Sequence, residues 1–480
     1  MEKRFFLFFL AATLLTSGWS QALSSEEQAL IESIDNRQPE YSVMAHQIWE
    51  WAELGYQEFK SSELLQDKLT EAGFSIEAGV ADIPTAFIAS YGSGEPIIAI
   101  LGEFDALPGV SQAAVPYPEA RPETENGHAC GHHLFGTASV AAAIAAKEWL
   151  TQHSDSGTIR FYGTPAEEGG AGKVYMVRAG LFDDVDAVLH WHPGSSNGAN
   201  PNSTLANTSA KFRFYGQAAH AAAAPERGRS ALDGVEAMNF MVNLMREHVP
   251  QETRIHYVIT RGGEAPNVVP AFAEVFLYVR HPERAVVREL FQRIVHAAEG
   301  AALGTGTRME YELIHGSYNL MPNVALAEVM HQSLSKVGGV NYTPDEAAFA
   351  TDIIATLNRP DVRLQDAATV QPFDTSWVVW SASTDVGDVS WVAPTAGLRT
   401  ATWAPGTPAH SWQAVAAGGM SIGEKGMMVA AKTLALSAVH LFQHPDICHT
   451  ARQELQRRTG PDFQYEALLG NRPPPLDYRN

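Results

Sequence analysis

The sequence holds very little cysteine and comparatively little positive charge. Only two cysteines, Cys130 and Cys448, occur in 480 residues, and because they stand in unlike sequence contexts we expect no disulfide between them. Acidic residues outnumber basic ones by 54 to 33, for a formal net charge of −21. Because binding to a phosphate backbone needs clustered lysine and arginine, we expect no nucleic-acid partner. A hydrophobic share of 45% nevertheless predicts a sizeable core.

Long hydrophobic runs are also missing, except at the N-terminus. Lys3 and Arg4 precede the largely apolar residues 5–15, and residues 20–22 (Ser-Gln-Ala) have the small side chains of a cleavage site. The apolar run is too short for a stable membrane anchor. We therefore expect residues 1–22 to be a signal peptide, a mature chain that begins at Leu23 and is periplasmic or secreted, and no membrane association after cleavage. The alternative is an uncleaved N-terminal anchor.

Strand and helix patterns alternate over the first 200 residues. The segments TAFIASYG (85–92), PIIAILGEF (96–104), GTIRFYG (157–163) and DAVLHWHP (186–193) are strand candidates, and SVAAAIAAKEWLTQ (139–152) is one of the helices expected around them. Continuous apolar strands of this kind are typical of a buried, mostly parallel sheet. The sequence thus predicts an α/β fold with helices on both faces of a mixed sheet. Ligand groups then gather at the carboxyl ends of the strands.

The pattern changes at residue 207. Polar and apolar residues alternate in SAKFRFYGQ (209–217), and the following segments predict the order β-α-β-β-α-β, the ferredoxin-like split pattern. We expect an inserted α+β domain over residues 207–317, with residues 23–206 and 318–480 forming the larger domain. After the insert we expect only loops and helices, including a long closing helix over residues 418–443.

Candidate metal ligands occur at four places, each in a predicted loop or at a strand end. Thiolate, imidazole and carboxylate groups are the ligands of zinc and its first-row neighbours. Any one of these histidines, taken alone, is more often structural. His190 and His192 project to the same face of a strand, so their spacing does not choose between them. The four places are Cys130 with His132, Glu167 with Glu168, His190 with His192, and His410.

The adjacent carboxylates of Glu167 and Glu168 indicate a reaction. One can bind a metal while the other stays free as the general base of a metal-assisted hydrolysis. A solvated acidic loop is the alternative for this pair alone. Asp105, at the end of an apolar strand, could orient a metal-bound imidazole or could form a turn. A serine nucleophile is disfavoured because the G-x-S-x-G pattern is absent. A Cys130–His132 thiol pair would leave the two glutamates and His410 without a role.

Several motifs together resemble the dinuclear-zinc metallopeptidase family (peptidase family M20), which also contains the aminoacylases. Within it the resemblance is to the aminoacylase-like amidohydrolase branch, over about residues 28 to 440. One departure is His133, where many members of the branch have aspartate, so the surroundings of the site are expected to differ. The motifs are GHACGHH (127–133), GTPAEEGGAGK (163–173), DAVLHWHP (186–193), GQAAHAAAAPERGRSALDG (216–234), RGGEAPNVVPAFAEV (261–275), STDVGDVSW (383–391) and GTPAHSWQ (406–413).

The resemblance implies a site, a cofactor and a partner. It implies two divalent metal ions per subunit, zinc or manganese, a small N-acyl amino acid substrate, and an inserted lid domain that makes a homodimer. Glu167 would be the general base, and His220 and Asn267 would hold the substrate, with such a histidine reaching the partner's site. A dipeptidase or carboxypeptidase of the same fold, or a binding protein that has lost catalysis, are the alternatives. The implied metal ligands are Cys130, His132, Glu168, His192 and His410.

Overall fold

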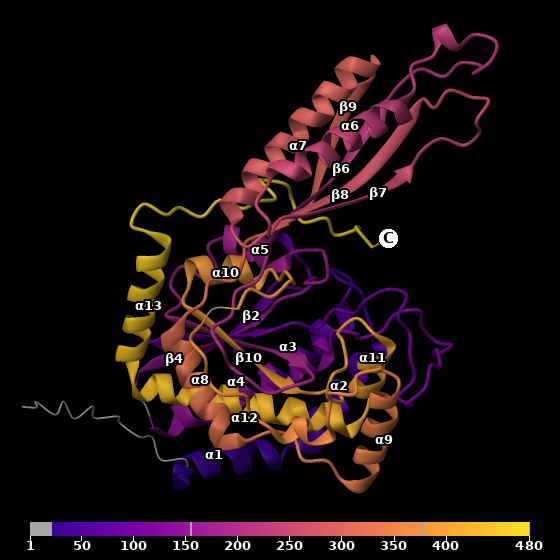
Figure 1. The fold of residues 1–480 in the computed structure, drawn as a ribbon. Helices are drawn as coiled ribbons and strands as arrows, with labels where there is room; N and C mark the ends of the chain where they lie inside the picture. Colours follow the sequence, from indigo (N-terminus) through magenta and orange to yellow (C-terminus); the bar gives the residue numbers. More distant parts are fainter. Residues whose placement is uncertain (1–21, 154–155, 377, 480) are drawn as a thin grey trace, which may run out of the picture.

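A computed structural model describes residues 22–153, 156–376 and 378–479 (Figure 1). The predicted signal peptide therefore lies, apart from Ala22, outside the described residues. The chain forms a large domain around a six-stranded sheet and a small domain around a four-stranded sheet. The small domain projects from one side of the large domain (Figure 1). Within the described ranges, no helix combines the length and apolar character needed to cross a bilayer.

The sheet of the large domain is mixed. β2 runs antiparallel to β1 and β4, whereas β3 is parallel to β4 and β5, and β5 is parallel to β10. In spatial order the strands are β1 (Ser75–Ala78), β2 (Phe87–Ser93), β4 (Gly157–Gly163), β3 (Ile97–Gly102), β5 (Ala187–Gly194) and β10 (Thr395–Ala401).

Helices cover both faces of this sheet, because the buried strands carry apolar side chains on both. Along β3, Ile98 and Ile100 pack into the core on one face, while Ala99 and Leu101 pack into the core on the other. The first face is covered by α1 (Ser25–Asp35), α2 (Gln38–Trp51), α3 (Phe59–Glu71), α4 (His132–His153), α8 (Val324–Val337), α12 (Ser421–Gln443) and α13 (Pro445–Thr459). The second is covered by α5 (Gly172–Arg178), α10 (Val386–Val392) and the short helix η1 (Val80–Asp82).

A smaller cluster lies beside the main core, around α9 (Pro344–Ala355) and α11 (Trp412–Gly418). Further 3-10 turns are η2 (Pro225–Arg227), η3 (Arg246–His248) and η4 (Leu364–Ala368). Cys448 is buried in the main core, and both cysteines are free thiols. Burial raises the pKa of the Cys448 thiol to about 12, so it stays protonated and packs as an apolar side chain.

The small domain has the predicted β-α-β-β-α-β order. Its strands are antiparallel throughout, and α6 (Ala231–Met245) and α7 (Arg284–Thr305) share one core with them. In spatial order the strands are β7 (Arg254–Arg261), β8 (Phe272–His281), β6 (Ala206–Tyr215) and β9 (Arg308–Ser317). The predicted fold class, an α/β domain with an inserted ferredoxin-like domain, is confirmed.

Two strands differ from the sequence prediction. β1 was not expected, and β10 replaces loop in the region where only helix and loop were expected after the insert. The sequence pattern of a buried strand does not reveal β10, because Gly397 and Arg399 interrupt its apolar residues. Those two positions pair with His190 and His192 of β5, so the polar side of β10 continues the polar side of β5.

Candidate metal centre

The predicted ligands come together at one edge of the large sheet. Cys130 directly precedes α4 and His132 begins it, Glu167 and Glu168 follow β4, His192 lies near the C-terminal end of β5, and His410 follows β10. All of them except His132 line a cavity of about 660 Å³, to which the small domain also contributes. This is the strand edge where an α/β fold collects its ligand groups.

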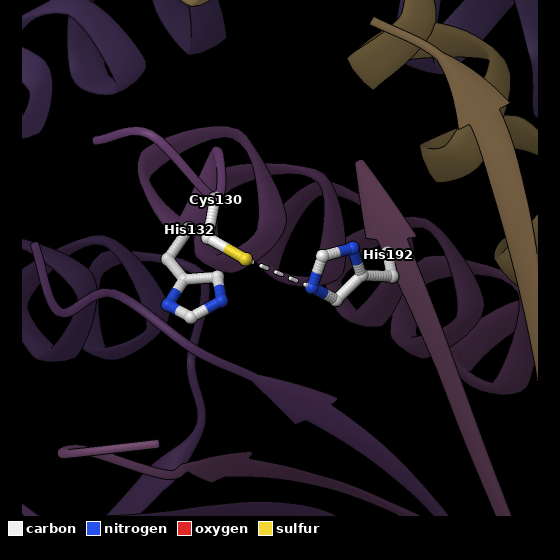
Figure 2. A group of neighbouring side chains, drawn as sticks. All are labelled: Cys130, His132 and His192. Atoms are coloured by element: carbon white, nitrogen blue, oxygen red, sulfur yellow. Dashed lines mark hydrogen bonds between the residues drawn. The ribbon is translucent and has the colours of Figure 1, made fainter. Parts of the chain in front are cut away.

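The first ligand group is Cys130, His132 and His192, whose candidate atoms all lie within 4.8 Å of one another (Figure 2). Cys130 Sγ is 3.4 Å from His192 Nε2. His192 Nδ1 donates a hydrogen bond to the Pro193 carbonyl at 2.7 Å, which leaves the Nε2 lone pair turned towards the thiol. Burial, followed by the charge of Arg399, holds the pKa of His192 well below its usual range. The ring is therefore neutral, as a metal ligand must be.

The second group shares the same cysteine with Glu168 and His410. His410 Nε2 lies 3.1 Å from Glu168 Oε1, and 54% of the His410 side chain is exposed. The proximity of Cys130, followed by that of Glu168, raises the pKa of His410 to about 10. These neighbours favour a positive charge at this point. Cys130 thus belongs to both the first and the second ligand group.

The third group is Glu103, His132 and Glu167. His132 Nδ1 donates to Asp105 Oδ1 at 2.9 Å, and His132 Nε2 lies 3.0 Å from Glu103 Oε2. Asp105 also accepts a hydrogen bond from the Glu168 backbone N–H at 2.9 Å. Asp105 therefore holds one imidazole and the Glu167–Glu168 loop at the same time, as expected of a residue that orients a ligand.

Several ligand atoms in these groups have no hydrogen-bond partner. Glu103 Oε2, His132 Nε2 and Glu168 Oε1 are buried and make no hydrogen bond of acceptable geometry to any described residue. Buried polar atoms without partners are costly, and carboxylate and imidazole atoms gathered in this way are satisfied by a cation. The donor set of sulfur, imidazole nitrogen and carboxylate oxygen therefore fits divalent metal ions.

A buried ion-pair network that sequence reasoning missed surrounds Glu103. Lys173 Nζ lies 2.8 Å from Glu103 Oε1 and 2.8 Å from Asp385 Oδ1, and all three side chains are buried. The Lys173 backbone N–H also donates to Asp385 Oδ2 at 2.9 Å. Lys173 and Asp385 each stand in one of the motifs, but nothing in either motif indicates that they would pair.

Glu167 belongs to the third ligand group and lines the cavity. Burial raises its pKa well above the usual value, and the nearby charges of Glu103 and Glu168 add to the effect. Its loop is tightly bent, with Ala166 and Ala171 both at left-handed φ angles of 58° and 60°. The buried carboxyl of Glu58 accepts a hydrogen bond from the Ala166 backbone N–H at 2.8 Å and fixes the start of this loop.

The C-terminal segment reaches the same loop, which the sequence did not indicate. The Tyr478 hydroxyl donates to the Glu168 carbonyl at 3.1 Å, and the Arg479 guanidinium donates to the same carbonyl at 2.5 Å. Figure 1 shows this segment passing from α13 between the two domains. Glu58 thus holds the start of the Glu167–Glu168 loop, and residues from the C-terminal end of the chain hold the loop at Glu168.

The remaining histidines of the motifs lie outside the three ligand groups. His128 and His133 are buried and donate to the carbonyls of Ile48 and Gly418, each at 3.0 Å. His190 lines the cavity beside Gly397, and burial lowers its pKa to about 3. The structure thus brings His192, and not His190, together with Cys130.

His220 and Asn267, the expected substrate-binding residues, do not line the cavity of their own chain. They lie side by side in the small domain, where the Ala221 N–H donates to the Asn267 carbonyl at 3.0 Å and His220 forms a bridge with Val268. His220 is exposed. A role for either residue in the cavity therefore requires another subunit or a movement of the small domain, and it stays a prediction.

Comparison with known proteins agrees with the family resemblance predicted from the motifs. The profile of "Peptidase family M20/M25/M40" matches residues 99–365. The chain is 45% identical over 453 residues to one of the subunits of the p-aminobenzoyl-glutamate hydrolase of Escherichia coli, covering 89% of this chain and 94% of that protein. It is 28% identical to the mouse (Mus musculus) Xaa-Arg dipeptidase, covering 91% of this chain and 93% of that one.

Among solved structures, a dinuclear metal-binding peptidase of the M20 family from Bacillus subtilis superposes with a TM-score of 0.56. It is 18% identical and the match covers 87% of this chain and 99% of that one, which shows a shared fold. The family resemblance predicted from the motifs is confirmed. The protein is a hydrolase that belongs to peptidase family M20/M25/M40.

Proposed function

We propose that this protein is an exported, metal-dependent amidohydrolase that cleaves the amide bond of an N-acyl or aryl-acyl amino acid, with aminobenzoyl-glutamate as the type of substrate. The observation that carries the proposal is the set of ligand atoms without hydrogen-bond partners beside a buried, raised-pKa Glu167. The relative in Escherichia coli, a p-aminobenzoyl-glutamate hydrolase subunit at 45% identity, supports the choice of substrate.

The residues of the site would have two roles, binding metal ions and transferring a proton. Cys130, His132, Glu168, His192 and His410 would hold two divalent ions, zinc or manganese. Bound ions of this kind polarise a carbonyl and lower the pKa of a water molecule. Glu103 lies within the third group and would stand close to the ion nearer to His132.

Glu167 would accept the proton of the attacking water and pass it to the nitrogen of the leaving amino acid. A general base works best when its pKa lies near the working pH, and burial among carboxylates moves Glu167 in that direction. Asp105 accepts a hydrogen bond from His132 Nδ1 and would thereby turn Nε2 towards a bound ion, and Glu58, Tyr478 and Arg479 hold the Glu167–Glu168 loop in place.

The assembly and location belong to the same proposal. Two relatives from Escherichia coli, 45% and 25% identical to this chain, are different subunits of p-aminobenzoyl-glutamate hydrolase. A second type of subunit is therefore an alternative to the homodimer that we propose. Residues 1–22 would direct the chain out of the cytoplasm. Intact mass of the protein from an extracytoplasmic fraction tests this, because a mature chain beginning at Leu23 is expected.

The general-base role is tested with Glu167→Gln. We expect the variant to keep its metal content and to lose about 10²–10⁴-fold in kcat on aminobenzoyl-glutamate, which is the usual share of general acid–base catalysis. The measurements are metal analysis of the purified protein and release of aminobenzoate. Glu283→Gln, a change in the small domain outside the cavity, is the matched control. Full activity of metal-loaded Glu167→Gln would contradict the role.

A dipeptidase is the second candidate, since the mouse relative is an Xaa-Arg dipeptidase. A panel of aminobenzoyl-glutamate, acetyl-amino acids, indole-acyl conjugates and dipeptides separates the two. Preference for dipeptides would replace the proposed substrate. A chain that binds members of this panel and hydrolyses none would be a binding protein, against which the intact Glu167 and ligand set already argue.

A further inference from the structure

The last residues of the chain connect both domains with the metal centre. Residues 465–479, called here the C-terminal strap, lie beyond α13 and pass between the domains (Figure 1). These residues form neither helix nor strand. The course of the strap is therefore set by the groups that it contacts along its way, and those contacts fall into three parts.

The first part of the strap is anchored at the junction of the two domains. The Tyr465 hydroxyl donates to Asp388 Oδ1 of α10 at 2.6 Å, and Asp388 Oδ2 accepts from the backbone N–H of Tyr318 at 2.8 Å. Tyr318 directly follows β9, and its hydroxyl donates to the Glu466 carbonyl at 2.6 Å. The strap is thus tied to the residue at which the chain leaves the small domain.

The middle of the strap is held by both domains, and its end at Arg472 is held by the small domain. Leu469 is buried in the core that α5 and α10 cover, but its backbone lies against Gly316 of β9, where a Cβ would come within 2.7 Å of the Leu469 nitrogen. The Arg472 guanidinium donates to the carbonyls of Leu313 and Ile314, also on β9. The position of Arg472 therefore follows that of β9.

Three consecutive prolines separate Arg472 from the residues that reach the metal centre. The ring of each proline fixes its φ angle, and a proline-rich segment acts as a semi-rigid spacer. None of Pro473, Pro474 and Pro475 is fully buried, so packing into a core does not explain them. A stiff spacer carries a displacement of Arg472 onwards, whereas a flexible one would absorb it.

The last part of the strap docks on the loop that carries Glu168. The Tyr478 hydroxyl and the Arg479 guanidinium both donate to the Glu168 carbonyl. The Tyr478 hydroxyl lies so close to Gly55 that a Cβ there would come within 2.4 Å of it, and the Tyr478 ring packs edge-on against Tyr56. Two donors from the strap thus fix the backbone of a residue whose carboxylate belongs to the second ligand group.

We propose that the C-terminal strap couples the position of the small domain to the loop that carries Glu167 and Glu168. Tyr478 and Arg479 are positioning residues, because they contact the Glu168 backbone and act through it on the metal centre. Arg472 and the three prolines transmit the position of β9. This inference deepens the proposed function, on which it rests for the reaction, by giving the metal centre a means to respond to the small domain.

The test measures zinc binding, which requires no knowledge of the substrate. In calorimetric titrations of metal-free protein, Arg472→Gln should weaken the affinity of at least one site by about tenfold, as for residues behind a ligand, although Arg472 does not line the cavity. Tyr478→Phe combined with Arg479→Gln should weaken it by at least as much. Arg308→Gln, which removes an arginine at the start of β9 that pairs with Glu310, is the matched control and should leave both affinities unchanged.

Replacement of the three prolines of the spacer by glycine tests its stiffness directly. This variant keeps every contact residue of the strap, but Arg472→Gln should have no further effect on zinc affinity in it, because a flexible spacer no longer carries the position of β9 to the loop. Pro360→Gly, in an exposed turn, is the control for the loss of a proline elsewhere. The same loss of zinc affinity on Arg472→Gln in the proline and the glycine background would overturn the coupling.

Hydrogen exchange of the loop gives a second readout and separates this inference from the proposed function. The backbone N–H groups of Gly169 and Gly170 donate to the carbonyls of Glu167 and Ala166, and we expect them to exchange faster in Arg472→Gln than in the wild type. If the wild type hydrolyses no member of the substrate panel, the function fails, and zinc affinity and exchange still decide on the strap. If both are unchanged in Arg472→Gln while the wild type hydrolyses aminobenzoyl-glutamate, the function stands and the strap is refuted.

Discussion

The Glu103–His132–Glu167 side and the Cys130–Glu168–His410 side of the metal centre differ in how their charge is balanced. On the first side, Glu103 and His132 are fully buried, and Lys173 neutralises Glu103 before any ion arrives. On the second side, more than half of the His410 side chain is exposed, and no lysine or arginine among the described residues forms an ion pair with Glu168.

This difference has a consequence for how the centre works. The buried side excludes solvent from His132 and Asp105, whereas a metal ion bound at the open side would exchange through the cavity. We expect the buried side to matter most for folding and the open side to matter most for metal uptake. The following variants test that contrast.

Removing the buried cation should have the largest effect. In metal-free protein, Lys173→Met leaves Glu103 and Asp385 facing each other without compensation, and breaking a buried ion pair on one side costs about 3–5 kcal/mol. Urea unfolding followed by fluorescence measures this loss. Arg160→Met, which breaks the partly exposed pair with Asp184, should cost less than about 1 kcal/mol. Equal stability of the two variants would contradict the contrast.

Removing the exposed ligand should act on metal binding and hardly on folding. His410→Ala is expected to weaken the affinity for one of the two ions by more than about 10²-fold, which exceeds the effect of losing a group that only orients a ligand. Titration of metal-free protein with zinc, followed by calorimetry, should then show one strong site in place of two. Weakening of both sites together would mean that the two sides are not independent.

The smallest effect is expected from a change at Asp105, which contacts both the buried and the open side of the metal centre. Asp105→Asn keeps the size of the side chain but weakens the hydrogen bonds to His132 Nδ1 and to the Glu168 N–H. We expect metal affinity to fall by about 10–100-fold, which is typical of residues behind a ligand. The same zinc titration measures it, with Asp184→Asn as the control for a carboxylate outside the cavity. Unchanged affinity would leave Asp105 as a turn residue.

Local patterns predicted the four places that hold candidate ligands, because each lies at the end of a strand or in a loop, and such positions meet at one sheet edge. The choice of Glu168 over Glu167 as a candidate ligand came from the family resemblance and not from these patterns. Lys173 and Asp385 could not be predicted as an ion pair, because their pairing joins residues 212 positions apart and leaves no local pattern. The same holds for Tyr478 and Arg479, which reach the Glu168 loop from the far end of the chain.

β10 shows a second limit of sequence patterns. A strand is recognised by its apolar residues, but Gly397 and Arg399 face a cavity, where the usual preference for apolar side chains does not apply. The positions that make this strand hard to recognise are the ones that shape the binding site. The ferredoxin-like small domain, whose strands alternate regularly over its own core, was easy to predict for the opposite reason.

His410 adopts a left-handed backbone conformation, with φ at 60°. A non-glycine residue in that region costs about 1 kcal/mol or more, which glycine would not incur. Directed evolution that selects heat resistance alone would therefore enrich glycine at position 410 and discard a residue that we propose as a metal ligand. A library screened for thermostability should hold this codon constant or include a round of activity selection.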